Sequence, residues 1–289
     1  MPPEFLADEL LLQNEHAEAW VSPWGATLTH LLIDGVEVIA HASKKDVQDS
    51  FAGVTLAPWP NRLADGTWRF ENQLFIAEIN DGKSSANHGL VFNRKFQVET
   101  QTNDSVSFNY LLGNDDAYPF EVSVEVSFSL NGSELVSEIS LRNQSNVKVP
   151  VAFGSHPYIS AAPDTQVSIH AASQAINNDA QIPTGVKSAQ KVLQSKFSDL
   201  NLDDCFWDLT RNEDGIAQVQ ISHTNGNNIW VWQDAVFKYL MIYTHPKMGL
   251  AVEPQTAPAN ALNSGQDLVW LSPGETVSGR WGIRVGSGK

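Results

Sequence analysis

The chain has 289 residues, of which 42% are hydrophobic, and this length and composition favour a globule with one large core. Eighteen basic residues against thirty-three acidic ones give a net charge of −15, which argues against binding to nucleic acid or to an anionic membrane surface. The single cysteine, Cys205, cannot form an internal disulfide, and the first residues lack the basic and apolar regions of a signal peptide. We therefore expect a soluble cytoplasmic protein that binds a neutral small molecule.

Short alternating segments separated by turn signals run along the whole chain, which is typical of β-strands. Apolar or alternating runs meet at Asp34-Gly35, Asn131-Gly132 and Asn225-Gly226, pairs that tolerate the positive φ of a type I′ hairpin turn. A last turn at Pro273-Gly274 is followed by another alternating run. Residues 6–20 and 188–200 could each hold one or two helical turns, but neither segment is periodic enough to build a helical layer.

The turn signals continue evenly, and we find no linker, charge block or clean internal repeat. We therefore predict that residues 1–289 form a single all-β domain, a large antiparallel β-sandwich. A closed barrel and a propeller are the alternative architectures.

Several connections carry more polar residues than a turn requires. The first, LAPWPNRLADGTW, places Trp59 between two prolines and before Asn61 and Arg62. A stiff loop of this kind can offer a sugar an apolar plate and a fork of donors. The same pattern is also found in packed loops with a surface arginine. The second, SSANHGLVF, presents His88 before a glycine that permits a sharp turn, although loop histidines are often surface or capping residues.

Two titratable residues precede prolines after apolar runs. His156 follows the apolar segment 149–153 and Gly154 in VPVAFGSHPYIS, and Glu253 follows Leu-Ala-Val in LAVEPQ. Because proline cannot donate to a ladder, we expect both residues at strand ends, with Glu253 at the lip of a sheet. A strand-end glutamate can also be simply solvated. His245 also precedes a proline, but its segment predicts a turn residue.

Adjacent acids, Asp203 and Asp204, stand in LNLDDCFWDL. Since neighbouring side chains on an extended chain point to opposite sides, at most one of them faces a given pocket. A solvated acidic turn is the alternative interpretation.

Taken in order, PWPNRLADGTW, NHGL, SHPYI, LDDCF and VEPQTAPANALNSG resemble the motifs of the aldose 1-epimerase, or galactose mutarotase, family. The resemblance covers nearly the whole chain. It implies a β-supersandwich fold and cofactor-independent interconversion of the α and β anomers of a free aldose such as glucose or galactose. It also implies a sugar substrate as the partner, with the protein a monomer or a homodimer.

Opening a sugar ring needs a base at the anomeric hydroxyl and an acid at the ring oxygen. By the resemblance, Glu253 is the base and His156 is the acid. The resemblance assigns sugar binding to Arg62, His88 and Asp203, and we add Asn61 and Trp59 from the same loop. The family usually has Asp-His before the Phe of the fourth motif, whereas this chain has Asp-Asp-Cys, so the assignment of Asp203 rests on alignment to Phe206.

Three other functions remain open. An epimerase acting on hexose 6-phosphates would need several cations near the pocket, and of Arg62, Arg69, Arg94 and Lys95 only Arg62 stands in a suitable motif. A sugar-binding module without catalysis would not require the acid and base. A metal enzyme is disfavoured because no H-x-H or H-E-x-x-H spacing occurs, so we expect neither a metal nor a cofactor.

Overall fold

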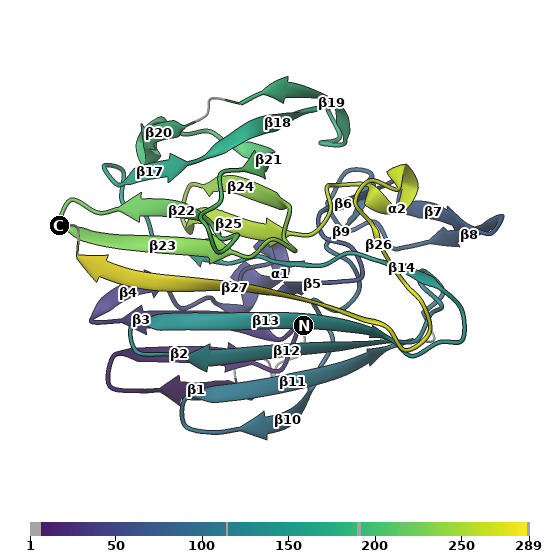
Figure 1. Cartoon of the computed structure of the whole chain (residues 1–289), viewed down its shortest axis with the longest axis horizontal. Helices are drawn as coiled ribbons and strands as arrows, with labels where there is room; N and C mark the ends of the chain where they lie inside the picture. The colour runs from purple at the N-terminus through teal and green to yellow at the C-terminus, as the bar shows by residue number, and fades with distance from the viewer. Residues whose placement is uncertain (1–6, 114, 190–191, 288–289) are drawn as a thin grey trace.

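The computed structural model describes residues 7–113, 115–189 and 192–287 (Figure 1). Within these residues the two largest sheets contain nine and eight strands, and their ladders are antiparallel. This confirms the predicted all-β chain with large antiparallel sheets packed as a sandwich. The prediction that residues 1–289 form a single domain stays a prediction.

The nine-stranded sheet is built from alternating sequences. In β12 (Val122–Leu130) every second side chain is buried in the core, and intervening residues such as Glu125 lie on the outer face. Successive strand residues point to opposite faces, so such a sequence buries one face only. In Figure 1, β11, β12, β13 and β27 lie side by side. The order across the sheet is β10 (Gln97–Gln101), β11 (Ser105–Leu112), β12, β13 (Glu134–Asn143), β27 (Thr276–Ser287), β23 (Asn227–Gln233), β22 (Ala217–Ser222), β17 (Gln166–Ile169) and β20 (Leu193–Lys196).

The eight-stranded sheet has a core face and a second face that carries a cavity. On β24 (Tyr239–His245), Leu240 and Ile242 pack into the main core, whereas Met241 and Tyr243 face the cavity. On the neighbouring β25 (Gly249–Gln255), Val252 faces the core and Glu253 faces the cavity. The remaining strands are β19 (Pro183–Ser188), β18 (Ala171–Asn177), β21 (Asp203–Leu209), β15 (Gly154–Ser155), β5 (Thr55–Leu56) and β16 (Tyr158–Ile159).

Smaller elements surround these sheets. The Pro273-Gly274 turn joins β26 (Val269–Leu271) to β27, but β26 pairs with β14 (Val149–Val151) and β27 pairs with β13, so the two strands do not form a hairpin. The small strands are β1 (Leu10–Gln13), β2 (Ala17–Ser22), β3 (Thr27–Ile33), β4 (Val36–Ile39), β6 (Arg62–Ala64), β7 (Thr67–Phe70), β8 (Gln73–Ile76), β9 (Ser85–Asn87), β14 (Val149–Val151) and β26 (Val269–Leu271).

The three predicted hairpins are present. At Asp34-Gly35, between β3 and β4, both residues have positive φ, 48° and 76°, as a type I′ turn requires. At Asn131-Gly132 and Asn225-Gly226 the positive φ falls on the glycine, at 58° and 91°. The strand pairing is therefore as the sequence predicts, although the turn geometry differs at two of the three positions.

The helical expectation was wrong for residues 6–20, whereas residues 188–200 hold one helical turn, and in the described residues neither segment builds a helical layer, as the sequence predicts. The described part of residues 6–20 forms β1 and β2, and residues 188–200 form strand and a 3-10 turn, Phe197–Asp199, with 190–191 outside the described residues. The α-helices of the described residues are α1 (Lys44–Ser50) and α2 (Ala261–Ser264). A capping box at Ser43 starts α1, and seven residues are too few to give a clear period in the sequence. Over the described residues, no helix has the length and apolarity needed to span a bilayer.

Candidate active site

A polar cavity of about 420 Å³ lies on the face of the eight-stranded sheet that is turned away from the main core. Cavities of this size are typical of small-molecule sites. Six of the seven residues predicted from the sequence line this cavity: Asn61, Arg62, His88, His156, Asp203 and Glu253.

Glu253 lies inside β25 and not at its end. The strand continues through Pro254 to Gln255, and Glu253 is paired with Met241 of β24. On the other side of β25, β16 pairs at Ala251 and β15 pairs at Gln255, so Pro254 falls in the gap between these two ladders. Since no neighbour needs an N–H there, the proline does not end the strand, and the expectation of a carboxylate at the lip of a sheet was wrong. The glutamate is instead 2% exposed.

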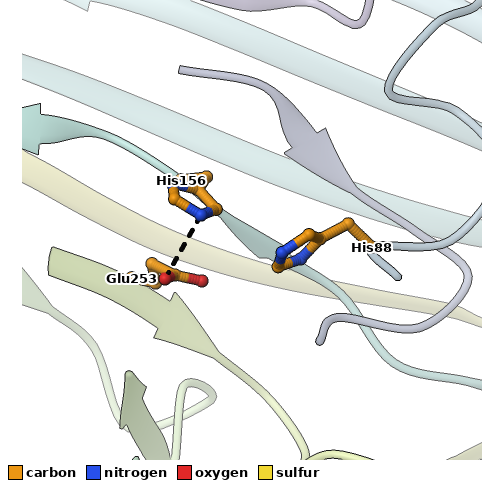
Figure 2. A group of neighbouring side chains, drawn as sticks. All are labelled: His88, His156 and Glu253. Carbon is orange, nitrogen blue, oxygen red and sulfur yellow. Dashed lines mark ion pairs between the residues drawn. The ribbon is translucent and has the colours of Figure 1, made fainter. Parts of the chain in front are cut away.

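His156 occupies the connection between β15 and β16, directly before Pro157 and 4% exposed, in agreement with the expected strand end. Its Nε2 is 3.3 Å from Oε1 of Glu253 (Figure 2). Gln255 Nε2 donates a hydrogen bond of 2.9 Å to the other carboxylate oxygen, Oε2. The ring of Tyr158 packs on the imidazole, with centroids 5.0 Å apart, and fixes its plane.

The pair is arranged to hold one proton. Burial raises the pKa of Glu253 to about 8, against the opposing effect of the hydrogen bond from Gln255. Burial also lowers the pKa of His156 to about 4. Both shifts favour the uncharged form of each group, the carboxylic acid and the neutral imidazole. A carboxylic acid beside an imidazole and a carboxylate beside an imidazolium contain the same number of protons, so one transfer interconverts an acid and a base here.

His88 is held as a hydrogen-bond donor. The backbone N–H of Asn61 donates to its Nδ1 at 3.2 Å, so a neutral ring carries its proton on Nε2. Burial, followed by the charges of His156 and Arg62, lowers the pKa of His88 well below its usual value and keeps the ring neutral. Gly89 (φ 73°) allows the loop to approach Ala57 closely, because a Cβ there would lie 2.1 Å from the Ala57 carbonyl oxygen.

Three of these groups lie close enough together to be considered as metal ligands. His88, His156 and Glu253 each offer one ligand atom within 4.8 Å of the others (Figure 2). Ligation through Nε2 of His88 requires its proton on Nδ1, which already accepts the N–H of Asn61. The donor set therefore does not fit a divalent cation without loss of this hydrogen bond.

Arg62 and Asp203 are neighbours in the lining of the cavity, with Nη2 of the arginine 3.7 Å from Oδ2 of the aspartate. Burial raises the pKa of Asp203, and the Arg62 charge opposes this shift. Asp204 points to the other side of β21 and accepts a hydrogen bond of 2.7 Å from Gln174. The two adjacent acids thus diverge as the extended backbone predicts, and Asp203 is the one in the cavity.

Trp59 does not line the cavity, which corrects the expectation that it contacts the sugar. Its ring is 2% exposed beneath the loop, and its Nε1 donates to the Ala86 carbonyl at 3.3 Å. The rigid prolines place Asn61 and Arg62, and the tryptophan fills the core below them. Apolar surface in the cavity comes instead from Phe51, Met241 and Tyr243, together with Tyr158.

Sequence reasoning missed several cavity residues. Asp49 and Ser50 come from α1, which was not predicted, and Asp81 comes from a turn whose Asp-Gly pair indicates the turn but not the cavity. His245 ends β24, and its Nδ1 accepts the backbone N–H groups of the following turn, as a turn residue does, yet it also lines the cavity. The alternation Met241, Tyr243, His245 on one strand was the signal that could have found it.

Comparison with known proteins identifies relatives over nearly the whole chain. The family described as "Aldose 1-epimerase" matches residues 8–284. The uncharacterized protein YihR of Escherichia coli K12 is 29% identical over 271 residues, which cover 87% of this chain and 84% of that protein. Human galactose mutarotase is 25% identical over 195 residues, covering 62% of this chain and 56% of that protein.

Solved structures show the same fold. The GalM/aldose epimerase homologue of C. elegans superposes with a TM-score of 0.85 at 18% identity, covering 97% of this chain and 99% of that one. A putative aldose 1-epimerase of E. coli K12 gives 0.83 at 17% identity, covering 96% and 99%. With the family match over residues 8–284, these findings show that the chain belongs to the aldose 1-epimerase family.

Proposed function

We propose that this protein is an aldose 1-epimerase that interconverts the α and β anomers of a free, neutral aldohexose such as glucose or galactose. The observation that carries the proposal is the buried pair of Glu253 and His156, 3.3 Å apart in a polar cavity. Burying two titratable groups in contact costs stability. A sugar-binding module without catalysis gains nothing from such a pair, whereas an epimerase uses it as acid and base.

The reaction needs only one proton donor and one acceptor. As carboxylate, Glu253 takes the proton of the anomeric hydroxyl while the His156 imidazolium gives a proton to the ring oxygen, and the bond between C1 and that oxygen breaks. Rotation about the bond between C1 and C2 presents the other face of the aldehyde. The reverse transfers then close the ring and restore both groups, so the buried pair has no net charge before or after ring opening.

The remaining polar residues would fix the sugar while C1 turns. The neutral His88 offers a single N–H, because its other nitrogen is engaged by Asn61. Arg62 offers charged donors and Asp203 a charged acceptor, and hydrogen bonds to charged groups are the stronger kind. Holding the hydroxyls at several points keeps the reacting atoms aligned with the acid and the base.

The charges around the cavity favour a neutral sugar over its 6-phosphate. Among the described residues that line it, Arg62 is the sole lysine or arginine, and the carboxyl side chains are Asp49, Asp81, Asp203 and Glu253. The cations considered from the sequence lie elsewhere: Arg69 is exposed on β7, Arg94 pairs with Asp115, and Lys95 pairs with Asp8. A dianionic phosphate would need at least two well-placed cations.

The test is anomer exchange by purified protein. Fresh α-glucose, α-galactose and xylose are followed by polarimetry, and glucose is compared with glucose 6-phosphate by NMR magnetisation transfer at matched concentrations. We expect faster exchange of the free sugars and a lower kcat/KM for the phosphate. No acceleration with any aldose would refute the proposed activity, and a clearly higher kcat/KM for the phosphate would move the protein to the hexose-phosphate branch. A cytoplasmic location remains part of the proposal.

A further inference from the structure

The guanidinium of Arg62 has an acceptor opposite each of its three nitrogens. Nε is 3.9 Å from Oδ2 of Asp81, Nη2 is 3.7 Å from Oδ2 of Asp203, and Nη1 is 3.4 Å from Oδ1 of Asn61. Asn61 and Asp203 were predicted from the sequence, whereas Asp81 was not. Arg62 is the sole arginine among the described residues that line this cavity, and Asp81 is a second carboxylate beside it, in addition to Asp203. The role of this second carboxylate needs an explanation.

Asp81 is fixed by its own turn. Its Oδ1 accepts the backbone N–H groups of Lys83 at 2.8 Å and Ser85 at 3.0 Å, which leaves Oδ2 facing Arg62. Burial pushes the pKa of Asp81 upward, but these backbone hydrogen bonds and the Arg62 charge outweigh it, so the pKa is lowered and the group is a carboxylate at neutral pH.

The contact between the two side chains is buried. The Asp81 side chain is 6% exposed and that of Arg62 is 18% exposed. Neither Oδ2 of Asp81 nor Nε of Arg62 has a hydrogen-bond partner, and both atoms are buried. Since a buried charge without a counter-charge is costly, each of these groups compensates the other.

We propose that Asp81 is a positioning residue for Arg62 and that, together with Asp203, it neutralises this arginine so that the site selects neutral sugars over anionic ones. This inference rests on the proposed function, because it names what the same cavity excludes. The Asp81 charge attracts the guanidinium at Nε, 3.9 Å away, and so directs the two Nη atoms along the cavity wall. An anionic sugar then meets an arginine whose charge is already balanced by two carboxylates.

The matched perturbation is Asp81→Asn. The amide retains Oδ1 for the N–H groups of Lys83 and Ser85, so the turn is preserved, and the negative charge opposite Arg62 is lost. We expect KM for glucose to rise about three- to tenfold with kcat changed less than about threefold, the pattern of lost ground-state binding. We also expect the ratio of kcat/KM for glucose 6-phosphate to that for glucose to rise about ten- to a hundredfold, because the loss of one charge at roughly 10 Å and an effective dielectric constant of about 20 is worth about a factor of ten for each of the two phosphate charges.

Asp115→Asn is the control. Asp115 also accepts a backbone N–H, from Ala117 at 3.0 Å, and also faces an arginine, with Arg94 Nη2 at 3.3 Å, but it does not line this cavity. The variant has the same net charge as Asp81→Asn and should leave the ratio unchanged. If Asp81→Asn does not fold, Asp81→Ser serves in its place, because a hydroxyl can accept the same backbone N–H groups without charge.

The outcomes separate the two proposals. An active wild type with an unchanged substrate ratio in Asp81→Asn would refute the role of Asp81 and leave the proposed function intact. An equal rise of the ratio in Asp115→Asn would also refute it, because the effect would then come from net charge alone. A wild type that accelerates no anomer exchange would refute the proposed function itself.

Discussion

Replacing Glu253 by Gln should stabilise the protein at alkaline pH while it removes the proposed base. The amide has nearly the same shape, and its oxygen can still accept the hydrogen bond that Gln255 donates to Oε2 at 2.9 Å. Its NH₂ group can donate to Nε2 of His156, which lies 3.3 Å from Oε1. The substitution therefore changes charge and proton content with little change in packing.

The magnitude follows from the burial of the carboxyl. Its pKa is raised from 4.5 to about 8, so the unfolded chain ionises at a lower pH than the folded one. A raised pKa contributes stability that is complete below about pH 4.5 and is lost as the pH rises to about 8. At about 1.4 kcal/mol per pH unit, the difference between the two values sets an upper limit of about 5 kcal/mol at pH 9, and we expect about 2–5 kcal/mol.

The assay is thermal unfolding followed by circular dichroism at pH 5 and pH 9. Glu253→Gln should melt within about 2 °C of the wild type at pH 5 and at least about 5 °C above it at pH 9, since 1 kcal/mol corresponds to about 2–4 °C in chains of this size. Glu125→Gln, on the exposed face of β12, controls for the lost charge. A difference between Glu253→Gln and wild type that is the same at both pH values would refute the reasoning, because an ionisable buried carboxyl must produce a pH-dependent difference.

The remaining predictions concern the mechanism and the loop that carries His88. Glu253→Gln and His156→Asn should each lower the rate of anomer exchange by about two to four powers of ten, measured by polarimetry, and His245→Asn should do much less. If His245→Asn is the more damaging histidine change, the acid has been assigned to the wrong residue. Activity should survive exhaustive treatment with EDTA without any added cofactor, and a full loss restored by a divalent ion would contradict this. Gly89→Ala should destabilise the protein by about 2–4 kcal/mol in urea unfolding and reduce activity, because its backbone has φ 73° and the new Cβ would meet the Ala57 carbonyl at 2.1 Å. A wild-type midpoint in that variant would show that the loop can move aside.

The sequence alone determined the fold class, because strand alternation and turn pairs are local signals. The alternation of apolar and polar residues with a period of two predicts the strands β12 and β13. The Asp34-Gly35 pair predicts a hairpin turn because both residues tolerate positive φ. The site motifs were also readable because the family resemblance fixed their order along the chain. Helix α1 was not predicted, because its seven residues are too few to show a clear period. The helix is stabilised by the capping box at Ser43 and by the packing of Val47.

Only the tertiary structure decided how the site residues are used. The proline after Glu253 predicts a strand end, but β25 continues past it because Pro254 lies in the gap between the ladders with β15 and β16. Glu253 is therefore buried inside the sheet, and this burial raises the pKa of its carboxyl group. The two prolines around Trp59 predict a stiff loop but not whether its ring faces the cavity or the core. The direction of the ring depends on the residues from other segments that pack beneath the loop, such as Ala86. Asp81 stands in an Asp-Gly turn pair, but this local signal does not reveal that its side chain faces Arg62. Burial and charge pairing are sums over contacts from distant segments, so no local pattern contains them.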